Sequence, residues 1–589
     1  MVTHVKALIK SALGEEKADL LIKGVKLVNV ATSEVYEADI SIKRGFIVSL
    51  MGNPKGARIE VDAKSLYAVP CFIDGHVHVE SSHLTITGFA EAVVPKGTAA
   101  AVFDPHEVAN VLGIEGVLGL ISESTRGVPF KAFFMAPSCV PSAPGLETSG
   151  AKIGVREIQR LLRSRRVLGL AEVMNYPGIL SCDENLLKKV HAARRLNKLV
   201  DGHCPKLRGY ELAAYISSGP RSDHEALTAE EVVEKLRNGL WVMIREGSAS
   251  KMLDKVLPTL IKLGMDLGRV MIVTDDVDPR DLINGHLDLA VRKAIRLGLD
   301  PIEAFKLVTL NPSMYFKLEP QVGLIAPGWE AHLILLNDLQ KVEAVKVMVA
   351  GKIVAANGKI VSPFKRISYP QRFYQTVSVK RDLKPEDFAV KAPISSGKAK
   401  VRAIVVEDGS LLTRESRLWL KVEEGKVLPD PSLDVLQVGV VERHGLTGSI
   451  GLGFVQGLGL RRGAIATTYA HDSHNLVVVG ADWRSMYIAA TKVIEMQGGI
   501  AVVEDDKLSS SLRLELAGLM SSQPVDELAK AFTLLHDTLR LLGCKLSSPL
   551  TTLSFITLPV IPELKITDRG LVDVNKQAIV SPIIDYSEE

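Results

Sequence analysis

Two histidines one residue apart follow an apolar stretch and are the first candidates for chemistry. His76 and His78 end the run that begins at Tyr67, and this run is typical of a buried strand. Side chains two positions apart on a strand point to the same side, so both imidazoles project together from the strand end. Two imidazoles placed in this way can hold one metal ion. Closely spaced histidines also occur without a metal, so the pair alone is a weak indication.

The same pattern, a polar side chain directly after an apolar strand, recurs along the chain. The residues in such positions are His106, Glu107, Glu172, His203, His224, Glu225, Asp275 and Asp276. Each one singly has an ordinary structural explanation, such as an ion pair, a hydrogen-bonded core histidine or a helix N-cap. Packing does not explain the whole set. We therefore interpret it as a metal site at one end of a sheet.

The elements that would position these residues alternate between strand and helix from about residue 66 to 320. The predicted strands are Tyr67–Asp74, Thr98–Asp104, Lys131–Pro137, Val167–Val173, Lys198–Gly202, Arg221–His224, Trp241–Arg245 and Arg269–Thr274. Stretches between them, such as Val155–Arg165, have helical periodicity. Eight strands with helical crossovers predict an α/β fold, a (β/α)8 TIM-like barrel, with functional residues at the C-terminal strand ends. A doubly wound open sheet is the alternative.

Short β-rich runs flank this region on both sides. They predict a small discontinuous β-sandwich domain formed by residues 1–66 and 321–363, around a barrel of residues 67–320. Residues 364–400 are rich in Pro, Ser and Lys and predict a connecting segment. Residues 401–589 alternate strands and helices and predict a C-terminal α+β domain. The glycine-rich stretch 451–459 lacks the lysine of a phosphate-binding loop, so we expect it to serve packing or turns.

Composition limits the classes of protein to consider. The chain has 589 residues, 47% of them hydrophobic and 24% charged, with a net charge of +3. This balance gives no electrostatic reason to expect nucleic-acid binding. The five cysteines form no C-x-x-C pair, and no apolar run approaches membrane-spanning length. We expect a cytoplasmic protein that binds neither nucleic acid nor membrane.

One polar string in the C-terminal region, residues 469–475, contains His471 and His474 around Asp472 and Ser473. A hydrogen-bonded loop is the plainer explanation. This string has too few metal ligands for a second metal centre. The family resemblance described next implies that it reaches the barrel mouth and acts on the substrate.

Longer segments of the chain resemble a known family. The sequence is similar to the bacterial and archaeal adenine deaminases of the amidohydrolase superfamily. The similarity rests on Pro70–Ser82, Asp104–Val111, Ala171–Asn175, Asp201–His203, Asp223–Glu225, Thr274–Asp276, Asn284–Asp288 and the string 469–475. It extends over essentially the whole chain. One departure is His332, where the superfamily usually has Asp; we expect a turn-forming role there.

The resemblance implies hydrolytic deamination of adenine to hypoxanthine and ammonia, in purine metabolism, with two divalent ions per chain. It implies that His76, His78 and Asp275 bind one ion, that His203 and His224 bind the other, and that Glu172 bridges both. The family implies manganese or iron, while the ligand types leave zinc open. We also expect a homo-oligomer, a dimer, with adenine as its small-molecule substrate.

The implied mechanism assigns further roles. Hydroxide formed on the ions attacks C6 of adenine, and Asp275 takes the proton and passes it to the leaving ammonia. A donor at the ring nitrogen N1 would stabilise the developing charge. His106, Glu107, Glu225 and His286 are the candidates for this donor, and Asp276, His471 and His474 are expected to bind or orient the substrate.

Three other functions fit parts of the pattern. A related barrel enzyme could act on another aminopurine or pyrimidine, or on a cyclic amide; Glu172 and the string 469–475 argue against it. A non-catalytic assembly protein usually lacks the metal ligands, and this chain keeps all six. A nucleic-acid deaminase would carry the zinc pattern H-x-E with P-C-x-x-C, which this sequence lacks.

Overall fold

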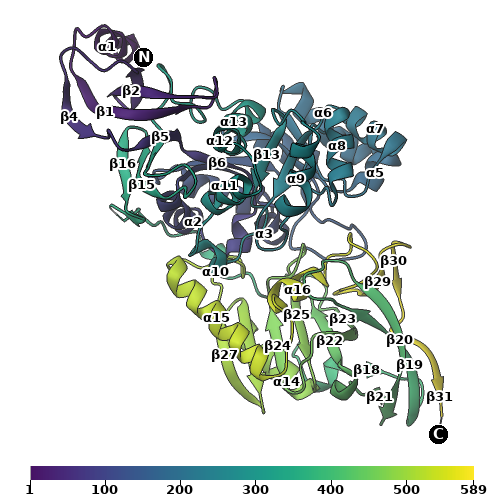
Figure 1. Ribbon diagram of the computed structural model, residues 1–589. Helices are drawn as coiled ribbons and strands as arrows, with labels where there is room; N and C mark the ends of the chain where they lie inside the picture. Colours follow the sequence, from purple (N-terminus) through teal and green to yellow (C-terminus); the bar gives the residue numbers. More distant parts are fainter. Residues whose placement is uncertain (1, 362, 589) are drawn as a thin grey trace.

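The computed structural model describes residues 2–361 and 363–588, and its strands form five sheets. Figure 1 shows a small sheet region next to the N-terminus, a central region of alternating strands and helices, and a large C-terminal sheet on the far side of that centre. The architecture is mixed α/β. No described helix is both long and apolar enough to cross a membrane.

The small sheet takes strands from both flanks of the central region. Its nine strands are β1 (Ala18–Asn29), β2 (Glu34–Lys43), β3 (Phe46–Ser49), β4 (Ala57–Asp62), β5 (Tyr67–Pro70), β14 (Leu333–Leu336), β15 (Ala344–Val349), β16 (Lys352–Ala356) and β17 (Lys359–Ile360). β5 and β14 pair antiparallel, with Pro70 opposite Leu333. The first half of β1 pairs with β4 and the second half pairs with β5. Both pairings belong to one sheet, which packs on an apolar core. Helix α1 (Val2–Ala12) packs on β2 and β3.

The predicted strand Tyr67–Asp74 is two strands in the structure. β5 ends at Pro70 and belongs to the small sheet, whereas the next strand starts at Phe72 in the central region. Proline has no N–H to donate to a ladder, which explains why the pairing changes here. The N–H of Cys71, between the two strands, donates to the carbonyl of His332. The His332 ring is buried, and its Nε2 lies 3.1 Å from Glu330 Oε2.

Eight parallel strands form the central region, in chain order. Five belong to one sheet and three to another: β6 (Phe72–Val77), β7 (Thr98–Phe103), β8 (Lys131–Ala136), β9 (Val167–Val173) and β10 (Leu199–Gly202), then β11 (Ser222–Asp223), β12 (Trp241–Arg245) and β13 (Val270–Val273). Backbone hydrogen bonds cross both seams, from Arg221 N to Val200 O (2.9 Å) and from His78 N to Asp275 O (3.0 Å). These strands are buried on both faces, as expected of parallel strands covered by helices.

Helices connect and cover these strands. They are α2 (Ile86–Val93), α3 (His106–Ser124), α4 (Val155–Leu162), α5 (Tyr176–Leu180), α6 (Glu184–Arg195), α7 (Gly209–Ser218), α8 (Ala229–Arg237), α9 (Leu253–Lys262), α10 (Pro279–Leu282), α11 (Leu287–Arg296), α12 (Pro301–Lys306) and α13 (Leu310–Phe316). Several begin at the capping residues that favour helix starts; Asp183 accepts from Leu186 N at 2.7 Å, and Thr228 caps α8. The helical connections place all eight strand ends on one side.

The C-terminal region is built on an eleven-stranded sheet. Its strands are β18 (Val390–Lys391), β19 (Gly397–Val405), β20 (Arg414–Glu423), β21 (Lys426–Val427), β22 (Val435–Val441), β23 (Ile450–Gln456), β24 (Ala464–Thr467), β25 (Leu476–Gly480), β26 (Gly499–Glu504), β27 (Lys507–Arg513) and β31 (Ile583–Ser587). A second sheet holds β28 (Leu564–Thr567), β29 (Gly570–Asp573) and β30 (Ala578–Val580), and the helices are α14 (Trp483–Glu495), α15 (Val525–Leu541) and α16 (Pro549–Phe555).

Most of the glycine-rich stretch lies in β23, where glycine allows a close approach of backbones. A Cβ on Gly451 would come within 1.8 Å of the carbonyl oxygen of Thr567 in β28. Glycine at this position therefore permits the packing of β23 on β28, which is the packing role that the sequence predicts.

The C-terminal region docks on the face of the central region where the strands end (Figure 1). Ser521 N donates to His83 O at 2.8 Å, and Asn475 Nδ2 donates to Thr148 O at 2.8 Å. Thr148 N in turn donates to Asp568 Oδ1 at 2.9 Å. These buried hydrogen bonds join residues far apart in sequence and bring the string 469–475 to the strand ends.

Candidate active site

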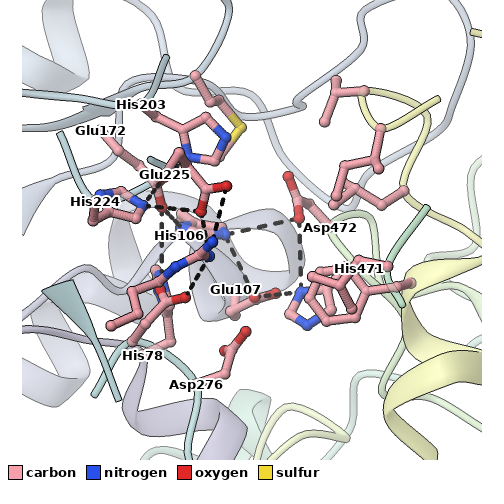
Figure 2. A pocket seen from close by; sticks show the side chains of 18 residues that line it. His78, His106, Glu107, Glu172, His203, His224, Glu225, Asp276, His471 and Asp472 are labelled. Carbon is pink, nitrogen blue, oxygen red and sulfur yellow. Dashed lines mark hydrogen bonds and ion pairs between the residues drawn. The ribbon is translucent and has the colours of Figure 1, made fainter. Parts of the chain in front are cut away.

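A cavity lies between the strand ends of the central region and the C-terminal region. Its polar side carries the histidines and carboxylates that follow β6, β7, β9, β10, β11 and β13 (Figure 2). Its opposite side is apolar and includes Phe555, Leu558 and Ile561. A flat, partly apolar molecule with polar edges would match these two kinds of wall.

His76, His78 and Asp275 form the first group of metal-ligand type. Asp275 Oδ1 lies 3.3 Å from His76 Nε2 and 3.2 Å from His78 Nε2. His78 Nδ1 lies 3.0 Å from the carbonyl of Asp104, which leaves Nε2 to face the group. Burial opposes ionisation of Asp275, but the two histidines and Arg245 outweigh it and hold the pKa of this carboxyl well below its usual value. The ionised form is the one that binds a metal.

Glu172, at the end of β9, lies between this group and a second one. Its Oε1 lies 3.5 Å from His78 Nε2, while its Oε2 lies 3.2 Å from His224 Nε2 and 2.5 Å from His203 Nδ1. The two carboxylate oxygens therefore face different histidines. Burial raises the pKa of Glu172, but His203 and His224 outweigh this effect and hold it well below the usual value.

The residues present fit a divalent metal. Three of the ligand groupings share members: His76, His78 and Asp275; His76, Glu172 and His224; and His203, His224 and Glu225, with the donor atoms of each within 4.8 Å of one another. His76 Nε2 is buried without a hydrogen-bond partner among the described residues, as expected of a nitrogen that would bind a metal ion. Imidazole nitrogen with carboxylate oxygen suits manganese, iron or zinc.

A second set of charged side chains adjoins these groups through His106, whose Nδ1 lies 3.6 Å from Glu172 Oε1. His106 Nε2 lies 3.4 Å from Glu107 Oε1 and 3.8 Å from Asp472 Oδ1. Burial lowers the pKa of His106, but Glu107 and Asp104 outweigh it and raise this pKa well above the usual value. His471 Nδ1 lies 2.6 Å from Glu107 Oε1, and this carboxylate raises the pKa of His471 to about 9 against the opposing effect of burial. His106 and His471 can therefore both donate protons.

Arg245 is a cavity residue that the sequence analysis did not single out. Its Nη1 donates to Asp275 Oδ2 at 3.1 Å, and its Nη2 donates to Glu225 Oε2 at 3.2 Å. It is the last residue of the apolar strand β12, so it has the same polar-after-apolar signal as the predicted site residues. Glu225 lines the cavity as predicted, and Asp276 does so beside Asp275.

Three predicted site residues lie off the described cavity wall: His76, which belongs to the first ligand group, and also His286 and His474. His286 is buried with Nδ1 2.9 Å from Thr98 Oγ1 and Nε2 3.2 Å from Asp74 Oδ2. His474 is fully buried behind Glu107. Neither ring belongs to the described lining of the cavity. His474 lies behind Glu107, and His286 lies behind Asp74, which accepts a hydrogen bond from the backbone N–H of His76.

A buried lysine supports the apolar wall from the C-terminal side. Lys565 Nζ donates to the carbonyls of Leu411 and Phe555, both at 3.0 Å, and both of these residues line the cavity. Burial without a carboxylate partner lowers the pKa of Lys565 to about 7. The lysine is thus about half charged at neutral pH.

We expect Lys565 to make the stability of the chain depend on pH. Its pKa is about 7 in the folded state and about 10.4 when unfolded. The unfolded state therefore binds more protons between these values, and stability rises with pH through this window, by about 1.4 kcal/mol per unit. The melting temperature of wild type relative to Lys565→Met should rise between pH 7.5 and 9. Lys530→Met, at an exposed position of α15, should differ from wild type in melting temperature by the same amount at every pH. A pH-independent difference for Lys565→Met would contradict the expectation.

Comparisons with known proteins give two family matches. Residues 67–354 match the amidohydrolase family, and residues 410–578 match the adenine deaminase C-terminal domain. An adenine deaminase from Archaeoglobus fulgidus is 44% identical over 583 residues, which is 98% of this chain and 98% of that protein. An adenine deaminase from Moorella thermoacetica is 41% identical over 573 residues, 96% of each chain. Among solved structures, a dihydropyrimidinase from Brevibacillus agri has a TM-score of 0.44 at 15% identity, over 58% of this chain and 96% of that chain.

Proposed function

We propose that this chain, which belongs to the adenine deaminase family, hydrolyses adenine to hypoxanthine and ammonia. One observation carries the proposal. The metal-ligand residues of the strand ends share a cavity with His471 and Asp472, which come from the region that matches the adenine deaminase C-terminal domain.

We infer that the eight parallel strands close into a (β/α)8 barrel, with residues 67–320 as its domain. The chain order of the strands and the hydrogen bonds across both seams support this inference. Residues 1–66 and 321–363 would form the small β domain, since their strands share a sheet. β18 lies within residues 364–400 and β19 begins there, so the C-terminal domain would begin before residue 401.

We propose two divalent ions, manganese or iron, in this site. His76, His78 and Asp275 would hold one ion, and His203 and His224 the other, with one oxygen of Glu172 toward each. Divalent ions in such a site lower the pKa of a bound water toward neutrality, which makes water reactive at the purine C6.

The side chains of the protein would then move the protons. Asp275 accepts a proton from the attacking water and returns it to the amino group, which leaves as ammonia when the C6–N6 bond breaks. Arg245 holds the second oxygen of Asp275 and so fixes its direction. His106 and Glu107 face the cavity where they can exchange a proton with the ring nitrogen, a role for which Glu225 is also placed. His286, which contacts Asp74, would act only by supporting the floor of the site.

The C-terminal wall would bind the base and exclude water. Phe555, Leu558 and Ile561 present an apolar surface on which a purine ring can pack. His471 and Asp472 close the polar side, and Asp276 adds an acceptor for an N–H of the substrate. Excluding water strengthens every charge interaction in the cavity. We also propose a cytoplasmic homodimer; the five unpaired cysteines favour a reducing compartment.

Ammonia release tests the proposal. Protein stripped with a chelator should release no ammonia from adenine, and reconstitution with Mn²⁺ or Fe²⁺ should restore release as two ions per chain are added. Adenosine, cytosine and dihydroorotate serve as competing substrates. Turnover of one of these in preference to adenine would contradict the proposal and assign the chain the activity of another member of the superfamily.

A further inference from the structure

Glu107 belongs to the central region, but its side chain is bonded to the C-terminal region. It is fully buried at the start of α3, yet its hydrogen-bond partner comes from 367 positions later in the chain. Its Oε2 accepts from His474 Nε2. Its Oε1 lies 2.6 Å from His471 Nδ1 but makes no hydrogen bond of normal geometry with any described residue. Oε1 therefore faces His106 and His471, the two cavity-lining histidines that can donate protons.

We propose that His474 is a positioning residue that fixes Glu107 for the substrate, and that His474 does not itself contact the substrate. The proposal rests on the proposed function only for the identity of the substrate. The supporting role of His474 is a separate claim, and it concerns a ring that lies outside the described cavity wall.

Both ring nitrogens of His474 are already engaged. The backbone N–H of Ala470 donates to Nδ1 at 3.1 Å, so this nitrogen carries no proton. The proton must then be on Nε2, which points at Glu107 Oε2. Burial also lowers the pKa of His474 in spite of the nearby carboxylate, which keeps the ring neutral. A neutral histidine with one acceptor and one donor in use has no atom left for adenine.

The loop that carries His474 is itself fixed, because side chains of the C-terminal domain donate to three of its carbonyls. Thr557 Oγ1 donates to His471 O at 3.0 Å, and His444 Nε2 lies 2.8 Å from Ser473 O. Arg443 is buried, its guanidinium donates only to neutral oxygens among the residues that the structure describes, and its Nε donates to His474 O. A loop anchored in this way can hold a carboxylate in one orientation, which a mobile lid cannot do.

A double-mutant cycle tests the inference. In the wild-type background, His474→Leu should lower kcat/KM by about 10- to 100-fold, the range expected when a hydrogen bond to a charged group is lost. In the Glu107→Gln background the same change should cost less than about twofold, because the carboxylate that His474 positions is already absent. His474→Gln, whose amide can still donate, should recover at least about tenfold over His474→Leu. Equal losses in both backgrounds would overturn the inference.

Two further measurements separate this outcome from other failures. The changes in melting temperature of His474→Leu, Glu107→Gln and the double variant, relative to wild type, should be non-additive, because His474 and Glu107 are in direct contact. This coupling is independent of the reaction, so it would stand if adenine were not the substrate. Metal analysis should show equal ion content in wild type and His474→Leu. Loss of an ion would mean that Glu107, His471 and His474 bind a metal, and would overturn the positioning role.

His332→Leu provides a matched control. His332 is another buried histidine beside a glutamate, with Nε2 3.1 Å from Glu330 Oε2, and it lies on the small sheet. This variant should lower the melting temperature without changing kcat/KM, and its effect should be the same with Glu107 or Gln at position 107.

Discussion

Glu172→Gln is expected to leave the fold intact, to remove one metal ion per chain and to abolish nearly all deaminase activity. The reason is the placement of the carboxylate: Oε1 faces His78, while Oε2 faces His203 and His224. A neutral amide keeps the shape but offers one oxygen and no negative charge, so it cannot balance two cations. Metal analysis of the purified protein and ammonia release from adenine measure the two effects.

Glu123→Gln is the control for this variant. Glu123 is a buried glutamate that accepts from the backbone N–H groups of Ile86 and Thr87, and it does not line the cavity. It should keep both ions and normal turnover even if the chain is destabilised. Full metal content with normal turnover in Glu172→Gln would reject the bridging role.

Asp275→Asn is expected to lower kcat by about 10²- to 10⁴-fold, the contribution of a well-placed acid or base, while weakening metal binding much less. Oδ1 of Asp275 meets His76 and His78, whereas Oδ2 meets Arg245. An asparagine retains an oxygen for the ligand position but cannot take a proton at pH 7. The rate should therefore be expressed per bound ion, from parallel kinetics and metal analysis.

The alternative role of Asp275 gives a different result. If it served only as a ligand, the variant would lose its ion, and saturating the assay with Mn²⁺ would restore turnover. A kcat that stays low at full metal occupancy assigns the proton transfer to Asp275.

Local sequence patterns determined most of the first layer of the site. A buried parallel strand must be apolar along its length, so a His, Glu or Asp directly after it stands out without any knowledge of the fold. His76, His78, Glu172, His203 and His224 were predicted in this way, and the structure brings them together at the strand ends. The division of the chain was predicted from the same periodicities. The structure splits the predicted strand Tyr67–Asp74 at Pro70 and places β18 and the start of β19 before residue 401.

Only the tertiary structure decided which residues form the second layer. His474 bonds to Glu107 across 367 positions, and His286 turns away from the cavity toward Asp74, although both have the same residue type as the proposed histidine ligands. Periodicity fixes the direction in which a side chain leaves its own strand or helix. It carries no information on which distant segment lies opposite, because that depends on how the two domains pack. The sequence alone therefore predicted the polar residues at the strand ends and indicated the family, and domain packing decided which of the C-terminal histidines lines the cavity and which lies behind it.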